Sequence, residues 1–198
     1  MKSLSMLLIS AVLFTSCAGS YYAINPDRLN YTAKTDNEGV LLNYRYAVLE
    51  QQGNKKYAKK ETRKGIKLVA ISLTNTTEKP VFYNKLAFYS GSRAFSPLDI
   101  NTIHRELKQA AASYLLFLFL TPMNLTIGYS SMPIGLGLGP GITISNMVTA
   151  SRANKSFKEE LLEQDLRDAV IDSGETIYGI IGFYGIGYDP LSIKIKNN

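Results

Sequence analysis

The chain has 198 residues and a formal net charge of +6, with 13 tyrosines, no tryptophan, one histidine and one cysteine. A single cysteine excludes an intramolecular disulfide, and cysteine and histidine are too scarce for zinc fingers, iron–sulfur clusters or His-rich metal sites. No set of nucleophile and base stands out, and no Gly-rich segment carries the Lys-Ser/Thr of a phosphate loop. We therefore expect no catalytic residue, no metal and no cofactor.

The first sixteen residues have the organisation of a secretory signal. A basic residue precedes an apolar run from Leu4 to Phe14, and the small residues Thr15 and Ser16 stand before Cys17. The apolar run is too short for a membrane span, which needs about 20 residues. We predict a signal peptide over residues 1–16.

The window Leu13-Phe14-Thr15-Ser16-Cys17 resembles the looser versions of the lipobox of bacterial lipoproteins. The resemblance implies cleavage before Cys17, acylation of that cysteine and attachment of the chain to membrane lipid. It places the protein in the bacterial cell envelope. Because no acidic sorting residue follows Cys17, we expect the outer membrane, facing the periplasm. Nucleic acid is not an expected partner there.

Strand patterns dominate the segment that follows. Residues 17–39 are polar and are expected to form a tether with a weak first strand. Val40–Leu49 alternates apolar and polar residues, which predicts a half-buried strand, and the charged stretch Glu50–Gly65 is expected as a connection. Ile66–Leu73 is apolar at nearly every position, which predicts a central strand covered on both faces. Two further strands are predicted, Val81–Tyr89 and an edge piece at Ala94–Leu98.

The middle of the chain changes to a helical pattern. A helix capped by Asp99 or Asn101 is predicted as far as Leu120. The stretch Gly135–Gly141 is expected to be a tight turn that allows close backbone approach. A second helix is predicted over about Ser145–Leu166, so that the two helices form an apolar hairpin.

Strand patterns return at the end of the chain, at Ala169–Ile171, Thr176–Tyr184 and Leu191–Ile195. Strands, then helices, then strands is the pattern of an antiparallel sandwich with an insertion. We predict a mainly β domain over residues 40–198, α+β overall, with the helical and Gly-rich insertion at about 100–166.

Two segments carry a second resemblance. The strand and Asn/Thr turn of Ile66–Thr77, paired with the Gly-Glu-Thr strand of Gly174–Phe183, look like immunoglobulin-like accessory domains of bacterial envelope lipoproteins. The resemblance implies an immunoglobulin-like β-sandwich and supplies no catalytic motif.

The block Gln109–Ser151 contains no charged residue, and within it Tyr114–Leu120 is apolar on every side of a helix. Three interpretations stay open. The favoured one is a helix packed over the sheet, the second is a partial dip into the bilayer, and the third is a complete span, for which a helix of about 20 Å is short. The candidate membrane or apolar contacts are Tyr114, Leu115, Leu116, Phe117, Leu118, Phe119 and Leu120.

A basic run lies in the connection after Glu50. Its candidate anion-contacting residues are Lys55, Lys56, Lys59, Lys60, Arg63 and Lys64. We interpret them first as a solvated hairpin whose lysines protect a sheet edge from aggregation. The second interpretation is contact with anionic head groups of the nearby membrane or with an acidic polymer.

These features favour a non-enzymatic protein that acts as an interaction or structural module at the membrane surface, with a protein partner in the envelope. The alternative is binding of a lipid or apolar ligand in a pocket between the helical hairpin and the sheet.

Overall fold

A computed structural model describes residues 17–37, 39–121, 124–127, 130–132 and 135–196, so the predicted signal peptide lies outside the described residues. The chain divides into two compact units. Unit 1 is built from the described residues up to Ser20 and from Gln109–Lys155, and unit 2 comprises Tyr21–Lys108 and Ser156–Asn198. Helix accounts for 39% and strand, in antiparallel sheets, for 29%, so the α+β class predicted overall is confirmed, but helix exceeds strand and the fold is not mainly β.

The larger sheet of unit 2 has the strand order β1-β2-β3-β10 and is antiparallel throughout. Its strands are β1 (Ala33–Asn37), β2 (Val40–Arg45), β3 (Ile66–Asn75) and β10 (Thr176–Tyr184). β3 and β10 pair along their length, with Val69 opposite Ile181. β3 is therefore a central strand, as its continuous apolar run predicts.

A second sheet of unit 2 has the order β11-β5-β6. Its strands are β5 (Leu86–Ser90), β6 (Arg93–Phe95) and β11 (Leu191–Ile195), while β4 (Val81–Phe82) pairs with β9 (Val170–Ile171). Side chains of both larger sheets meet in one core, to which Val69, Ile71, Phe88 and Ile193 contribute. The two sheets thus bury one face of each against the other.

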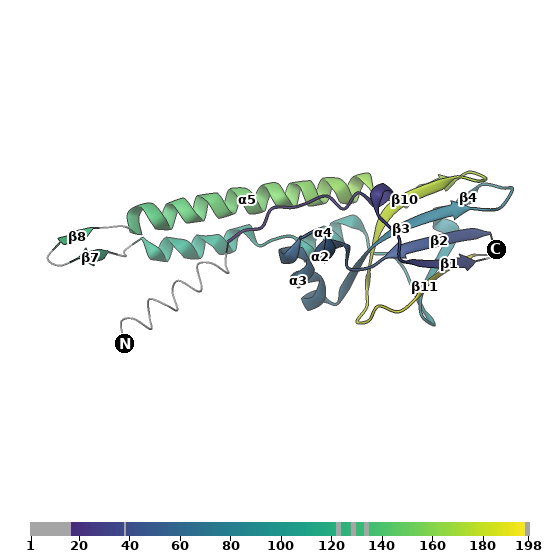
Figure 1. Ribbon diagram of the computed structural model, residues 1–198, viewed down its shortest axis with the longest axis horizontal. Helices are drawn as coiled ribbons and strands as arrows, with labels where there is room; N and C mark the ends of the chain where they lie inside the picture. The colour runs from purple at the N-terminus through teal and green to yellow at the C-terminus, as the bar shows by residue number, and fades with distance from the viewer. Residues whose placement is uncertain (1–16, 38, 122–123, 128–129, 133–134, 197–198) are drawn as a thin grey trace. The chain divides into compact units, whose positions relative to one another are not determined.

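Short helices contact β3 (Figure 1). They are α2 (Val48–Gln51), α3 (Lys55–Lys64) and the single 3₁₀ turn η1 (Pro26–Arg28). The helix α4 (Ile100–Leu107) contacts α3, and a second 3₁₀ turn, η2 (Tyr83–Lys85), lies between β4 and β5. At Gly182 in β10, an added Cβ would lie 2.7 Å from the Cδ1 of Ile103 in α4, so α4 packs closely onto the sheet. Leu68 is fully buried and Ile66 likewise, which shows why β3 lacks a polar face.

Unit 1 contains a 3₁₀-helix, a small hairpin and most of a long helix. These are η3 (Ala111–Leu120), β7 (Leu125–Ile127), β8 (Ser130–Met132) and α5 (Gly135–Glu163), whose last residues from Ser156 belong to unit 2. The two strands of the hairpin pair antiparallel. The Gln109–Lys155 part of unit 1 falls inside the insertion expected at about 100–166, whereas α4 and the end of α5 belong to unit 2.

Four local expectations are wrong. The strand predicted over Val81–Tyr89 is divided into β4 and β5 by the 3₁₀ turn η2. The basic stretch is not a connection or a hairpin, because Lys55–Lys64 forms α3, closed by Gly65 at φ +61°. The predicted strand over Val40–Leu49 ends at Arg45, since Ala47 adopts a left-handed conformation and Val48 opens α2. The glycines of Gly135–Gly141 form the first turns of α5 rather than the turn of the helical hairpin.

The helix predicted as far as Leu120 is also divided. α4 ends at Leu107, and the apolar run continues separately as η3. Asp99 caps α4 as expected, because its carboxylate accepts a hydrogen bond from the Thr102 N–H at 3.0 Å.

Candidate functional site

The 3₁₀ geometry of η3 sorts an apolar run into three columns of side chains. Residues three apart lie above one another in such a helix, and runs as long as ten residues are uncommon. The column that contains Tyr114 and Phe117 turns toward the interior of unit 1: Tyr114 is buried, Phe117 is half-buried, and their rings stack at 6.3 Å. The other two columns remain exposed.

The inward column is held against α5 by a close backbone approach. An added Cβ at Gly139 would lie 3.1 Å from the carbonyl oxygen of Phe117 and 3.0 Å from the nitrogen of Thr121. The Thr143 hydroxyl lies within hydrogen-bond distance of the Tyr114 carbonyl, at 3.3 Å. The close approach expected for the Gly-rich stretch is therefore confirmed at Gly139, although it joins η3 to α5 and not two arms of a turn.

The exposed columns leave large apolar side chains in water. Leu116 is 66% exposed and Phe119 79%, and Leu115 and Leu118 are exposed as well. These side chains are not buried within unit 1, to which η3 belongs, and packing of the run over the sheet stays a prediction. The side chain of Leu120 lies outside the described residues. In the described part of the chain, no helix has the length and apolar character that a membrane span requires.

Cys17, the predicted site of acylation, lies in the same unit as η3 and is exposed. The residues after it are fixed by hydrogen bonds: the Ala18 N–H donates to Oδ1 of Asn146 at 2.6 Å, and the Gly19 N–H donates to Oε1 of Gln109 at 3.0 Å. The pKa of the Tyr114 phenol is raised, mainly by burial and further by the nearby Cys17. Cys17 is thus positioned beside the apolar run, not at the end of a loose segment.

The predicted tether is also fixed where it enters unit 2. Glu160 of α5 accepts hydrogen bonds from the backbone N–H groups of Ile24 and Asn25, at 2.7 and 2.9 Å, and from the Tyr21 hydroxyl. Asn54 binds both the N–H and the carbonyl of Tyr22. No sequence signal identified these contacts, because they join residues far apart in the chain.

The basic run forms one face of α3, which we call the basic face. Its members are Lys55, Lys56, Lys59, Lys60, Arg63 and Lys64, at the spacing that keeps side chains on one half of a helix. Tyr57 and Glu61 occupy the opposite side and are buried. Lys, Ala, Glu and Arg are strong helix formers, so composition and the Gly65 stop were signals that could have revealed this helix.

Like charges crowd the end of the basic face. The Lys60 ammonium donates to the Lys108 carbonyl, and partial burial together with repulsion from Arg63 and Lys64 lowers the pKa of Lys60. Lys64 pairs with Glu106 at 2.9 Å. The face therefore keeps a surplus of positive charge that an anion would offset.

Glu61 lies under the basic face with its carboxylate in the protein interior. It is 6% exposed and accepts a hydrogen bond from the Leu68 N–H at 2.9 Å. Burial raises the pKa of Glu61 to about 7, although the Leu68 N–H and Lys67 oppose the rise. This carboxyl group was not identified from the sequence.

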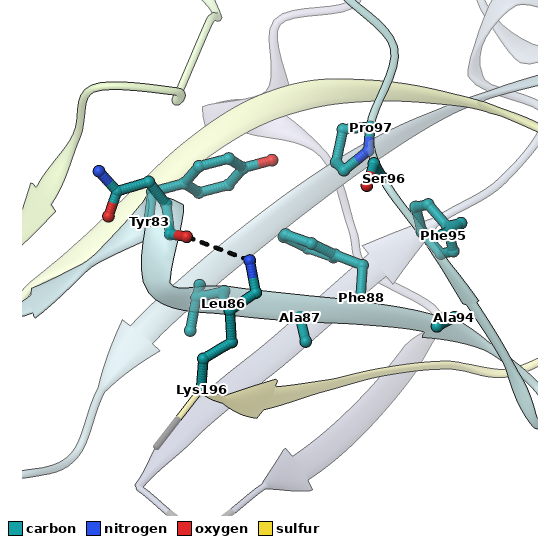
Figure 2. Close-up of a pocket in the computed structure, with 10 residues that line it drawn as sticks. Tyr83, Leu86, Ala87, Phe88, Ala94, Phe95, Ser96, Pro97 and Lys196 are labelled. Carbon is teal, nitrogen blue, oxygen red and sulfur yellow. Dashed lines mark hydrogen bonds between the residues drawn. The ribbon is translucent and has the colours of Figure 1, made fainter. Parts of the chain in front are cut away.

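Unit 2 also contains a cavity of about 380 Å³ beside the second sheet (Figure 2). The rings of Tyr83, Phe88 and Phe95 line it, and the Lys196 ammonium at its edge donates to the Asn84 carbonyl at 3.3 Å. Within the described ranges, no three His, Cys, Asp or Glu side chains gather as metal ligands would.

No protein-family model, curated protein or solved structure matches this chain. The class of protein must therefore be argued from the arrangement of its own residues.

Proposed function

We propose that this chain is a non-enzymatic lipoprotein of the bacterial cell envelope, anchored through acylated Cys17 and facing the periplasm from the outer membrane. In this proposal unit 1 contacts the membrane, and unit 2 is an interaction or structural module that binds a protein partner in the envelope. Acyl lipid is the only membrane component bound covalently.

The observation that carries the proposal is the position of Cys17 in the same compact unit as the exposed apolar side chains of η3. An acyl chain on Cys17 would enter the bilayer from the same unit that exposes Leu116 and Phe119. Removing such a side chain from water is worth roughly 1.5–3 kcal/mol. The exposed side chains of η3 would add a non-covalent contact with the bilayer to the lipid anchor. The partial dip into the bilayer is therefore the interpretation that we adopt.

Support for the role of unit 2 comes from its two facing antiparallel sheets and from the clamp on its N-terminal segment. Facing sheets are what an immunoglobulin-like accessory module would need, and we propose that unit 2 serves as one. Glu160 accepts hydrogen bonds from Tyr21, Ile24 and Asn25, and Asn54 binds the backbone of Tyr22, which would hold the start of unit 2 firmly to the rest of the module.

The test separates the acyl anchor from the apolar contact. Cys17→Ser is made in a chain whose first sixteen residues are replaced by a signal that another peptidase removes. We expect this variant to lose labelling by a fatty-acid analogue yet stay partly with the membrane fraction. Adding Leu116→Ser and Phe119→Ser should release it to the soluble fraction, because the second contact is then lost.

The matched control is Leu162→Ser, which changes an exposed leucine of α5 in unit 2. It should leave the distribution unchanged. An unmodified mature chain that begins at another residue in mass spectra would contradict the anchor. Full release by Cys17→Ser alone would contradict the role given to η3.

Binding of an apolar ligand is the second candidate function, and the cavity in Figure 2 favours a location within unit 2. Aromatic rings with one ammonium at the edge suit a small amphiphile that bears a carboxylate. Lys196→Gln should weaken binding of a fluorescent fatty acid but not of the matching alcohol. Lys194→Gln is the control, because that ammonium lies over the ring of Tyr89. Equal affinity for acid and alcohol in the parent chain would exclude a role for Lys196.

A further inference from the structure

The last residue of β10 and the loop that leads to β11 expose large apolar and aromatic side chains. Ile186 is 98% exposed, and Tyr184 and Tyr188 on either side of it are also exposed. Glycines alternate with these three residues, so each large side chain extends from a narrow backbone. An exposed apolar group rimmed by polar residues marks an interaction surface.

This loop is fixed next to the end of the basic face. The Gly185 N–H donates to the carbonyl of Gly65, which caps α3, at 2.9 Å. The Lys67 ammonium lies 4.0 Å from the centre of the Tyr188 ring. In Figure 1 the yellow chain between β10 and β11 leaves the sheet beside α3. The loop and the basic face therefore belong to one part of unit 2.

The charge of this region is mainly positive. Six cations lie on the basic face, whereas Lys67 is buried with its ammonium over the ring of Tyr188. Against them stand Asp189 in the loop, Glu106 paired with Lys64, Glu50 on the neighbouring α2, and Glu61 below the surface. Anions are attracted to such a surface, and attraction falls with added salt.

We propose that the β10–β11 loop and the basic face of α3 together bind an anionic lipid surface. Ile186 inserts at the boundary between head groups and acyl chains, Tyr184 and Tyr188 lie at head-group depth, and the basic face contacts lipid phosphates. This inference rests on the proposed function, because the anchor keeps the chain close to a bilayer.

A lipid surface fits these observations better than a protein surface does. Amphipathic aromatic side chains beside an isolated isoleucine suit the gradient from water to hydrocarbon, and flexible lysines suit mobile phosphates more than fixed partners. Lysine is depleted in the cores of protein interfaces. Capture of a protein is thus the competing outcome of the test.

The experiment uses the full chain with Cys17→Ser, so that acylation plays no part. Binding is measured by co-sedimentation with vesicles of phosphatidylcholine alone and of phosphatidylcholine mixed with phosphatidylglycerol. We expect the parent to prefer the anionic vesicles and to lose that preference at high salt. Arg63→Gln and Lys59→Gln should each weaken binding to anionic vesicles about fivefold, because each basic residue near an anionic surface raises the affinity by about that factor. Ile186→Ser should weaken it about tenfold.

Two control variants change matched residues outside this surface. Lys34→Gln removes an exposed lysine of β1, and Leu162→Ser removes an exposed leucine of α5. Both should bind like the parent, and circular dichroism checks that each variant folds. Equal binding to both kinds of vesicle, or unchanged binding after Ile186→Ser and Arg63→Gln, overturns the proposal. The proposal is also overturned if the variants bind vesicles like the parent and lose only the capture of an envelope protein. Failure of the Cys17 anchor would leave these vesicle results as they are, so the two proposals fail separately.

Discussion

Replacing the buried carboxyl group of Glu61 by an amide should change how the stability of the protein depends on pH. Glu61→Gln keeps an oxygen that can accept the Leu68 N–H and removes the charge. In the parent chain, burial raises the pKa of Glu61 from 4.5 to about 7. The folded state therefore binds this proton more tightly than the unfolded state does.

The sign and size of the effect follow from linkage. Between pH 4.5 and about 7, the folded chain holds the proton and the unfolded chain has lost it, so the free energy of unfolding falls as pH rises. The full loss corresponds to about 3 kcal/mol. The contribution is complete below the unfolded pKa and is gone above the folded pKa. The glutamine of Glu61→Gln does not titrate, so the free energy of unfolding of this variant should rise relative to that of the parent as pH increases.

Urea denaturation across this pH window measures the difference in the free energy of unfolding between the parent and Glu61→Gln. The contributions of His104 and of all other groups that the two chains share cancel in this difference. Glu78→Gln serves as the comparison for removing a carboxylate from the surface, since Glu78 is exposed in the turn after β3. Parallel stability curves for the parent and Glu61→Gln would show that Glu61 does not titrate as a buried group.

Three further experiments test the packing of unit 2. Leu68→Asp and Val69→Asp should each cost several kcal/mol in thermal denaturation, because β3 is buried on both faces, and a melting point near that of the parent would contradict its central position. Glu160→Ala should lower the free energy of unfolding by about 3 kcal/mol, because it removes the acceptor of the Ile24 and Asn25 N–H groups. Hydrogen exchange at these two amides should become faster. Rapid exchange already present in the parent would show that these hydrogen bonds are not formed. Gly182→Ala should lower the free energy of unfolding by about 1–3 kcal/mol, because the added methyl group would clash with Ile103. Adding Ile103→Val should recover part of that loss. Strictly additive effects of the two substitutions would exclude the contact.

Hydrophobic patterns within single segments of the sequence predicted the strands that form the centre of unit 2. The continuous apolar run of Ile66–Leu73 can only be stable with both faces covered, and the structure confirms it as β3. Thr176–Tyr184 and Leu191–Ile195 are confirmed with the predicted bounds, as β10 and β11. In each case the side chains themselves specify burial, so the pattern is sufficient.

Tertiary contacts decided the elements whose own pattern is ambiguous. Lys55–Lys64 has few apolar residues, so its sequence shows no clear buried face. In the structure, the burial of Tyr57 and Glu61 against the rest of unit 2 defines which face of α3 points inward. Tyr114–Leu120 is apolar throughout, so its sequence cannot say which side faces inward; the close approach of Gly139 selects the column of Tyr114 and Phe117.

The position of Cys17 is the clearest case of information that lies outside the local sequence. The sequence by itself predicts a lipid anchor at this cysteine, from the signal-like pattern that precedes it. Its place beside η3 depends on hydrogen bonds from Ala18 and Gly19 to Asn146 and Gln109, which lie 90 or more positions away. Such contacts leave no periodicity in the chain, because single polar side chains satisfying distant backbone groups form only when the fold brings them together.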